Sequence, residues 1–203
     1  EWFEKSPGVI AHYDFKYQNG GVVHRYEDIP SLLDEARELG INHLLLSGWH
    51  WDGFDHGFPN YFSDPELGTE EQLKEAIGNV TGRGGHVCFY VNSRLANTKY
   101  DQLRDFINEN VVIRRDGTPH IENYGNADLS FGAMCINSAG WQQKLRDTLR
   151  YITEEVGVDG VYLDQLGMAP PGLCCAREHG HAPDRWNRSY QQLLGDVIGR
   201  RRE

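Results

Sequence analysis

The chain has 203 residues, of which 39% are hydrophobic, 11% aromatic and 25% charged, and this composition excludes the disordered and fibrous classes of protein. Its 20 basic and 30 acidic residues give a formal net charge of −10, which disfavours nucleic acid and anionic membrane surfaces as partners. Because no run of about eighteen apolar residues occurs, we expect a soluble protein, either cytoplasmic or extracytoplasmic.

Strand-like and helix-like segments alternate along the chain. An apolar run rich in β-branched and aromatic residues is repeatedly followed by a loop, an amphipathic helix and a glycine. In chain order we expect strand 9–15, helix 28–39, strand 41–49, helix 69–80, strand 85–92, a helix over 100–107, a helix over 138–156, strand 160–164 and a helix over 190–198. This alternation is typical of an α/β protein with a parallel sheet.

Two local patterns add detail to this alternation. Thr69 and Gln72 have the spacing of a capping box, which predicts the first turn of the helix over 69–80. Residues 111–124 have the pattern of a β-hairpin that turns at Asp116-Gly117. We expect this hairpin to be an excursion at the mouth of a barrel.

Four parallel strands are half of the number in a (β/α)8 barrel of the TIM type, and a complete barrel needs about 250 residues. We therefore predict a partial barrel. In this interpretation residues 1–203 form one domain that contains the first four to five β/α units, the N-terminal half of the barrel.

Polar and aromatic side chains gather where the expected strands end, which is where barrels of this type form their active sites. Cleavage of a glycosidic bond needs carboxylates beside an oxocarbenium-like transition state, and sugars bind to aromatic faces and to polar groups. The strand ends supply both kinds of group, in His12, Tyr13, Asp14, Trp49, His50, Trp51, Asp52, Tyr90, Asn92 and Asp164.

Asp164 is the most informative of these residues. The preceding run VYL has the pattern of a buried strand, and a carboxylate at the end of a buried strand loses hydration unless it is paired or used. The residues alone leave two interpretations open: a catalytic carboxylate, or an aspartate that caps the following loop.

The loop over 50–56 contains His50, Asp52, Asp55 and His56, which are all possible metal ligands. Three interpretations remain: a loop held by hydrogen bonds and aromatic packing, a sugar-contacting loop, and a metal site. We favour them in that order, because nothing in the sequence fixes the geometry of a metal site.

Histidines and cysteines near the C-terminus also allow several roles. His179 and His181 could be metal ligands, substrate contacts or a clasp of their loop, and we favour substrate contact or a clasp. The four cysteines show no zinc spacing, and the adjacent Cys174 and Cys175 are more often structural than reactive.

Five segments carry a resemblance to a known family: HYDFKYQNG, HRYEDIPSLLDEARELGINHLLLSGWHWDGFDHGFPNY, GHVCFYVNSRL, CINSAGWQQKL and GVDGVYLDQLG. The most specific are GVDGVYLDQLG and the GWHWDGFD loop. They resemble the catalytic barrel of bacterial glycoside hydrolase-like proteins related to the alpha-galactosidase and endo-alpha-N-acetylgalactosaminidase groups. The resemblance spans residues 9 to about 186. It implies that Asp164 attacks the anomeric carbon, and that an acid/base carboxylate comes from a later strand, which this sequence does not include.

The resemblance also implies, more weakly, that Asp14, Trp49, Asp52, Asp55 and Asn92 line a sugar pocket. Together with the strand-end and loop residues, this gives the expected substrate-binding set: Asp14, Trp49, His50, Asp52, Asp55, Tyr90, Asn92, His179 and His181.

The favoured hypothesis is a retaining O-glycoside hydrolase domain that forms a covalent glycosyl intermediate on Asp164, acts on an oligosaccharide or glycoside, and uses no metal or cofactor. One alternative is a metal-dependent hydrolase barrel in which His12 and Asp14 on the first strand, with histidines from later loops, bind zinc. Another is a non-catalytic, carbohydrate-binding partial barrel. Its open strand edges would be covered by a second copy of the chain or by the C-terminal half of the barrel.

Overall fold

A computed structural model describes residues 2–13, 15–125, 129–166, 169–170 and 172–199 of the protein. The chain divides into two compact units. Unit 1 comprises Glu1–Val91 and Arg150–Leu163, and unit 2 comprises Asn92–Leu149 and Asp164–Glu203.

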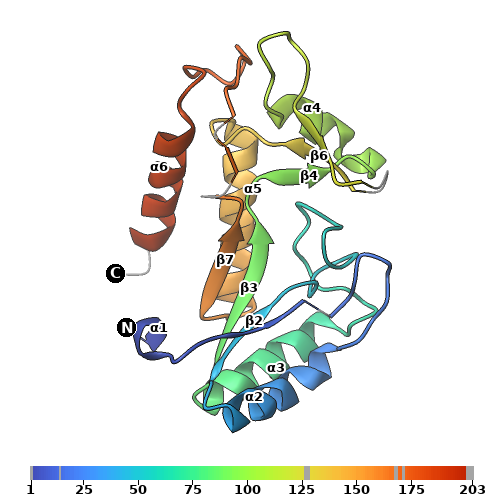
Figure 1. Ribbon diagram of the computed structural model, residues 1–203, viewed down its shortest axis with the longest axis vertical. Coiled ribbons are helices and arrows are strands. Elements are labelled where there is room, and N and C mark those ends of the chain that lie inside the picture. The colour runs from blue at the N-terminus through green and yellow to red at the C-terminus, as the bar shows by residue number, and fades with distance from the viewer. Residues whose placement is uncertain (1, 14, 126–128, 167–168, 171, 200–203) are drawn as a thin grey trace. The chain divides into compact units, whose positions relative to one another are not determined.

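Unit 1 is built on a parallel sheet with the strand order β1-β2-β3-β7 (Figure 1). The strands are β1 (Ile10–His12), β2 (His43–Leu46), β3 (His86–Asn92) and β7 (Gly160–Asp164). Parallel register pairs Ile10 with Leu44 and Leu44 with Val87. Each of these strands therefore lies beside the previous parallel strand of the chain, as in a barrel, and the predicted four parallel strands are confirmed.

Strand β2 is shorter than the run 41–49 that the sequence suggests. All four of its residues are buried, as expected for a strand covered on both faces. The sheet pairing ends at Leu46 because Gly48 takes the left-handed conformation, with φ of 68°. A Cβ atom at Gly48 would lie 2.7 Å from the carbonyl oxygen of Lys16, so only glycine fits this turn.

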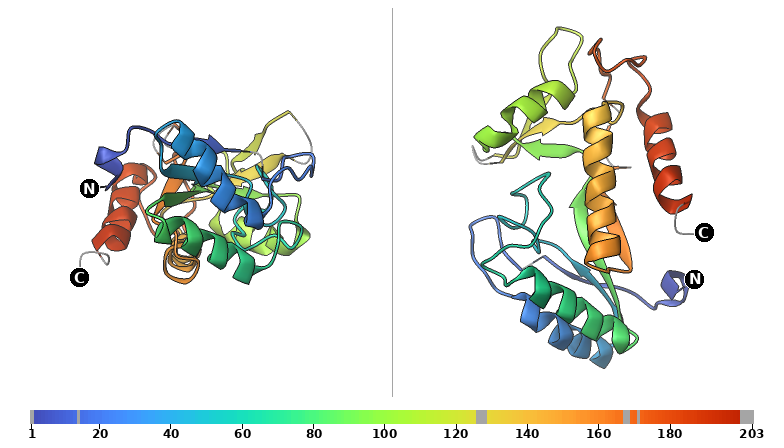
Figure 2. Two further views of the ribbon diagram at one scale, coloured as in Figure 1. Left: turned by 90° about the horizontal axis from the view of Figure 1, so that it is seen from below. Right: turned by 180° about the vertical axis from the view of Figure 1, so that it is seen from behind.

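Two amphipathic helices pack side by side on unit 1, α2 (Ile29–Glu38) and α3 (Glu70–Gly82) (Figures 1 and 2). Their buried faces carry the apolar residues that the periodicity predicts: Ile29, Leu32, Leu33, Ala36, Leu73, Ala76, Ile77 and Val80. Unit 1 also contains α1 (Trp2–Lys5), the 3-10 turn η1 (Tyr26–Asp28) and the π-helical turn η3 (Tyr151–Glu155).

The start of α3 has the capping box that the sequence predicts. The Gln72 amide donates to Thr69 Oγ1 at 3.2 Å, and the Thr69 amide donates to Gln72 Oε1 at 2.7 Å. We expect Thr69→Ala to lower the free energy of unfolding by about 1 kcal/mol, because the Gln72 amide loses its side-chain acceptor. Urea denaturation measures the change. The control is Thr81→Ala, since Thr81 Oγ1 bonds back to the Ile77 and Gly78 carbonyls within the helix and caps no amide. A loss as large as that of Thr69→Ala would contradict the cap's role.

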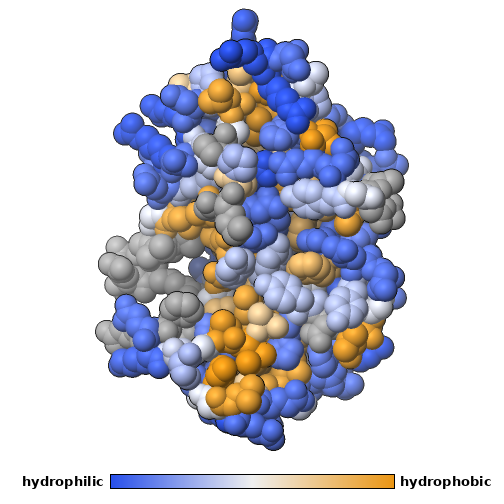
Figure 3. Space-filling view, viewed as in Figure 1, coloured by the Kyte–Doolittle hydropathy of each residue, from blue (hydrophilic) through white to orange (hydrophobic). Residues whose placement is uncertain are grey.

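Strand β7 differs from the expectation of a buried strand. Tyr162 is 45% exposed, and the other residues of β7 are half-buried. The physical reason is the strand order, which leaves β7 at one edge of the sheet. Hydrophobic side chains also gather at the surface in the lower part of Figure 3, and the exposed apolar residues of unit 1 include Val9 and Leu39.

Unit 2 contains a second, antiparallel sheet with the order β4-β6-β5, which the sequence did not predict. Its strands are β4 (Leu95–Asn97), β6 (Ser130–Ala133) and β5 (Ile121–Asn123). Between α4 and β5, Ile113 pairs with Pro119 across a turn closed by a hydrogen bond from the Gly117 amide to the Arg114 carbonyl.

Three helices and one 3-10 turn complete the described part of unit 2: η2 (Asp101–Leu103), α4 (Arg104–Asn110), α5 (Ala139–Arg150) and α6 (Trp186–Gly199). Trp141 of α5 and Trp186 of α6 are buried in one hydrophobic cluster with residues of α4 and β4. Among the described residues, no helix combines the length and apolar content that crossing a bilayer requires.

Candidate functional site

Asp164 is the last residue of β7, and Ser93 holds its backbone in place. The amide and the hydroxyl of Ser93 both donate to the Asp164 carbonyl oxygen, at 3.2 and 2.7 Å. The next residue, Gln165, has a backbone φ of 62°, in the left-handed region that residues other than glycine rarely adopt. A strained residue of this kind costs about 1–3 kcal/mol and is typical of functional sites.

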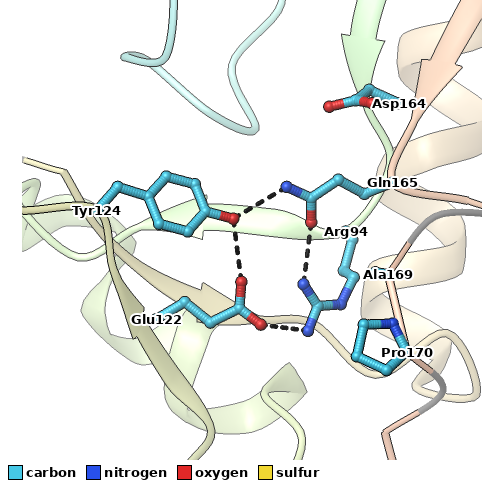
Figure 4. Close-up of a pocket in the computed structure, with 7 residues that line it drawn as sticks. All are labelled: Arg94, Glu122, Tyr124, Asp164, Gln165, Ala169 and Pro170. Atoms are coloured by element: carbon cyan, nitrogen blue, oxygen red, sulfur yellow. Dashed lines mark hydrogen bonds and ion pairs between the residues drawn. The ribbon is translucent and has the colours of Figure 1, made fainter.

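Asp164 lines a cavity of about 310 Å³ in unit 2. Figure 4 shows its carboxylate pointing away from its strand. The other lining residues are Arg94, Glu122, Tyr124, Gln165, Ala169 and Pro170. The volume falls at the lower end of the range of small-molecule sites, so the cavity has room for about one sugar ring.

Four of the lining side chains form a closed ring of hydrogen bonds (Figure 4). The Arg94 guanidinium donates to Gln165 Oε1 at 2.9 Å and to Glu122 Oε1. Gln165 Nε2 donates to the Tyr124 hydroxyl at 3.0 Å, and that hydroxyl donates to Glu122 Oε2, also at 3.0 Å. Each of the four therefore fixes the orientation of its neighbours, which leaves the cavity wall polar and ordered.

The ion pair within this ring decides the charge of Glu122. The Arg94 side chain is only 2% exposed, and its guanidinium also lies over the Trp186 ring at 5.8 Å. Burial works against ionisation of Glu122, but the hydrogen bond and the charge of Arg94 outweigh it and lower the pKa of Glu122. Glu122 is thus an anion near neutral pH, which suits a structural anchor and not a general acid.

Asn92 sits where β3 ends and is 2% exposed. Its Oδ1 accepts hydrogen bonds from the amides of Arg94 and Leu95, at 3.0 and 2.9 Å. This is an Asx turn that redirects the chain from β3 into β4. Asn92 thereby positions Arg94 for the hydrogen-bonded ring.

Trp49, His50 and Tyr90 lie in the interior of unit 1. Trp49 is 0% exposed, stacks on Phe89 with 3.9 Å between ring centroids, and donates from Nε1 to the Tyr90 carbonyl at 3.2 Å. Burial lowers the pKa of His50 to about 4, so its ring is neutral at neutral pH. Tyr90 is 5% exposed and stacks with Tyr162. Sugar contact by these three residues stays a prediction.

Asp52 and Asp55 shape the loop that follows β2. Both have left-handed backbones, with φ of 63° and 58°. Asp52 Oδ2 lies 3.5 Å from His56 Nδ1, and Gln18 Nε2 donates to Asp55 Oδ2 at 2.5 Å. The loop is held by hydrogen bonds and aromatic packing, the interpretation that the sequence favours first.

A buried ion pair that sequence analysis missed anchors the same loop. Asp64 is 1% exposed, and its Oδ2 lies 2.8 Å from Lys16 Nζ and accepts the Asp52 amide at 2.9 Å. Burial alone would lower the pKa of Lys16, but Asp64 and Glu66 together raise it. No local pattern marks a pair whose members are 48 positions apart.

His179 and His181 lie in unit 2 beside two cysteines, Cys135 and Cys174. They are not among the described residues that line the Asp164 cavity. The lining residues of this cavity also do not include Asn92 or the predicted substrate-binding residues of the described part of unit 1, which are Trp49, His50, Asp52, Asp55 and Tyr90. Asp14 lies outside the described residues.

Arg94, Glu122, Tyr124 and Gln165 are the cavity residues that sequence analysis missed. Two of them stand inside motifs already singled out, Arg94 in GHVCFYVNSRL and Gln165 in GVDGVYLDQLG. Gln165 could have been found as the neighbour of Asp164. Glu122 and Tyr124 lie at the end of the predicted hairpin over 111–124, but nothing in that pattern singles out these two side chains.

Comparison with known proteins supports the resemblance seen in the sequence. A Bacteroides thetaiotaomicron protein named "Putative glycoside hydrolase" is 33% identical over 153 residues, which is 73% of this chain and 22% of the relative. A Monosiga brevicollis protein, "Putative glycoside hydrolase 22789", is 29% identical over 142 residues, 63% of this chain and 11% of the relative. The chain thus spans about a fifth or less of the length of these relatives.

Solved structures confirm the fold. The alpha-N-acetylgalactosaminidase NagBb from Bifidobacterium bifidum, in complex with GalNAc, matches 95% of this chain with a TM-score of 0.75 and 18% identity, although the chain covers only 33% of it. The chain is therefore an α/β partial barrel of the TIM type and a glycoside hydrolase-like domain. A family model matches residues 12–202, and the chain belongs to that family, the domain of unknown function DUF6259.

Proposed function

We propose that this chain is the nucleophile-bearing half of a retaining glycoside hydrolase barrel. The observation that carries the proposal is the position of Asp164: the end of the fourth parallel strand, before a strained residue, on the wall of a polar cavity. The similarity to glycoside hydrolase-like relatives supports the same chemistry. Active sites of TIM barrels form at this end of the strands.

In the proposed reaction the Asp164 carboxylate attacks the anomeric carbon of the sugar and forms a glycosyl ester. The bond from that carbon to the leaving oxygen breaks as a second carboxyl group, about 5–5.5 Å from the first, donates its proton to the oxygen. Water then attacks the same carbon, gives its proton to the second carboxylate and releases Asp164. The sugar leaves with its original anomeric configuration.

The second carboxyl group belongs, in this proposal, to a strand beyond the four parallel strands described. Glu122 lines the same cavity, but Arg94 keeps it ionised, so it has no proton to donate near neutral pH. The exposed apolar surface of unit 1 and the edge position of β7 favour a further half-barrel that covers them. A second copy of this chain is the other possible cover.

The substrate class we propose is a glycoside with a terminal α-linked galactose or N-acetylgalactosamine unit. The support comes from two relatives of similar fold. NagBb is an alpha-N-acetylgalactosaminidase, and the alpha-galactosidase TtGalA from Thermus thermophilus binds p-nitrophenyl alpha-D-galactopyranoside. TtGalA matches 95% of this chain, and 35% of its own length is covered, with a TM-score of 0.63 and 13% identity.

Covalent trapping tests the proposal. The polypeptide translated from the complete reading frame is incubated with a 5-fluoro-galactosyl fluoride, whose glycosyl-enzyme hydrolyses slowly, and is then digested for mass spectrometry. We expect one added fluoroglycosyl group on the peptide that contains Asp164. The control Asp101→Asn removes an exposed carboxylate paired with Arg104 and should label like the wild type. Label on another carboxylate, or turnover with inverted configuration, would refute the assignment.

A further inference from the structure

Four side chains with metal-ligating atoms meet in unit 2, away from the residues that the proposed function uses. They are Cys135, just after β6, and Cys174, His179 and His181 from the segment before α6. One atom from each residue lies within 4.8 Å of all the others. Cys135 Sγ is 3.2 Å from His181 Nε2, and Cys174 Sγ is 3.4 Å from His179 Nδ1.

These separations fit the edges of a tetrahedron around a zinc ion. Zinc binds sulfur at about 2.3 Å and imidazole nitrogen at about 2.0–2.1 Å, so the sulfur–nitrogen edge of a tetrahedral site is roughly 3.6 Å. Both measured sulfur–nitrogen distances fall just below this value. A shift of a few tenths of an ångström per side chain would seat the ion.

The hydrogen bonds of His179 and His181 leave one ring nitrogen of each available to bind a metal ion. His179 Nε2 lies 2.9 Å from the Glu109 carbonyl, and His181 Nδ1 lies 2.7 Å from the Ala182 carbonyl. Because a carbonyl only accepts, each of these nitrogens carries the proton. The lone pairs of His179 Nδ1 and His181 Nε2 therefore face the sulfurs, the arrangement in which metal-binding histidines are held.

The two cysteine sulfurs lie in a buried, apolar setting. Cys135 and Cys174 are 1% and 2% exposed and pack with Val112 and Ala176, which keeps water from the sulfurs. As metal ligands, both thiols would release their protons when the ion binds.

We propose that Cys135, Cys174, His179 and His181 form a structural zinc site. The donor set of two thiolates and two imidazoles selects zinc among the common divalent metals. Four protein ligands leave no open position, so the ion would not act on substrate. The site would instead fasten the segment 172–183 to the end of β6, next to the hydrogen bonds from the Cys174 amide to Pro183 and from the Cys175 amide to Ile113.

The experiment measures metal content and ligand type without relying on activity. The protein is purified under reducing conditions, stripped with a chelator, reloaded with Zn²⁺ or Co²⁺ and dialysed. We expect one zinc ion per chain by elemental analysis. The cobalt form should show thiolate-to-metal charge-transfer absorption and tetrahedral d–d bands, and Zn²⁺ should raise the Tm of the stripped protein.

Variants separate the site from adventitious binding. Cys135→Ser/Cys174→Ser should retain no zinc and show no charge-transfer band, whereas Cys175→Ser, a change at the very next residue, should behave like the wild type. The wild-type reloading series needs no variant to fold, so a folding defect in the double variant leaves the test intact. Wild-type protein that retains no zinc, a double variant that retains as much as the wild type, or a Cys135–Cys174 disulfide found by mass spectrometry would each overturn the proposal.

Discussion

Replacing Asp164 with Asn is expected to lower kcat for the glycoside substrate by about four orders of magnitude or more, the scale seen when an essential nucleophile is removed. An amide has almost the shape of a carboxylate but cannot attack the anomeric carbon as an anion. The substitution keeps the backbone carbonyl that Ser93 binds and nearly the side-chain volume of aspartate, so we expect the fold to be retained. Release of a chromogenic aglycone by the complete polypeptide measures the loss.

A rescue experiment distinguishes a nucleophile from an acid/base group. Added azide should restore turnover in Asp164→Gly and give the glycosyl azide of inverted configuration, because azide occupies the face that the carboxylate used. An acid/base variant would instead give the retained azide. Asp101→Asn, at an exposed and remote carboxylate, should keep wild-type kcat. Activity that survives in Asp164→Asn at unchanged Tm would remove Asp164 from the mechanism.

The parallel sheet could be predicted because its signals are local. The strand over 160–164 was placed at its observed bounds, and the helix over 69–80 was placed by its apolar period and by the Thr69 capping box. The second sheet could not be predicted, because β4 and β5 have three residues each and show no alternation. Their pairing with β6 depends on contacts between distant segments, as in Leu95 with Ala133.

The residues of the candidate site also divide into those with a local signal in the sequence and those brought together only by the fold. Asp164 could be identified because a carboxylate that directly follows an apolar strand is visible in the sequence. The Arg94–Glu122 pair could not, because its members are 28 positions apart and each resembles an ordinary surface charge. The cluster of Cys135 with Cys174 was missed for the same reason: zinc motifs are recognised by short spacings, and here the fold supplies the proximity.

Replacing Arg94 with Met is expected to lower the free energy of unfolding by about 3 kcal/mol at pH 7. The loss is at the lower end of the range for breaking a buried ion pair, because the Glu122 side chain remains 21% exposed to water. Methionine keeps most of the apolar volume of the arginine stem, so the loss reports on the charge and on the hydrogen bonds to Glu122 and Gln165. Urea denaturation measures it. Arg115→Met, at an exposed arginine, should change stability by less than about 0.5 kcal/mol.

The pH dependence of this loss identifies its cause. Because Arg94 lowers the pKa of Glu122 below its ordinary value of 4.5, ionised Glu122 stabilises the wild type above that value, and this contribution is lost as the pH falls through the lowered pKa. In Arg94→Met the cation is absent, so the pKa of Glu122 is expected to be higher than in the wild type. The difference in stability between the two proteins should therefore be full at pH 7 and should shrink as the pH falls, first through the pKa of Glu122 in the variant and then through its lower pKa in the wild type. A difference that stays constant over this range would mean that Arg94 acts through its packing on Trp186 and not through its charge.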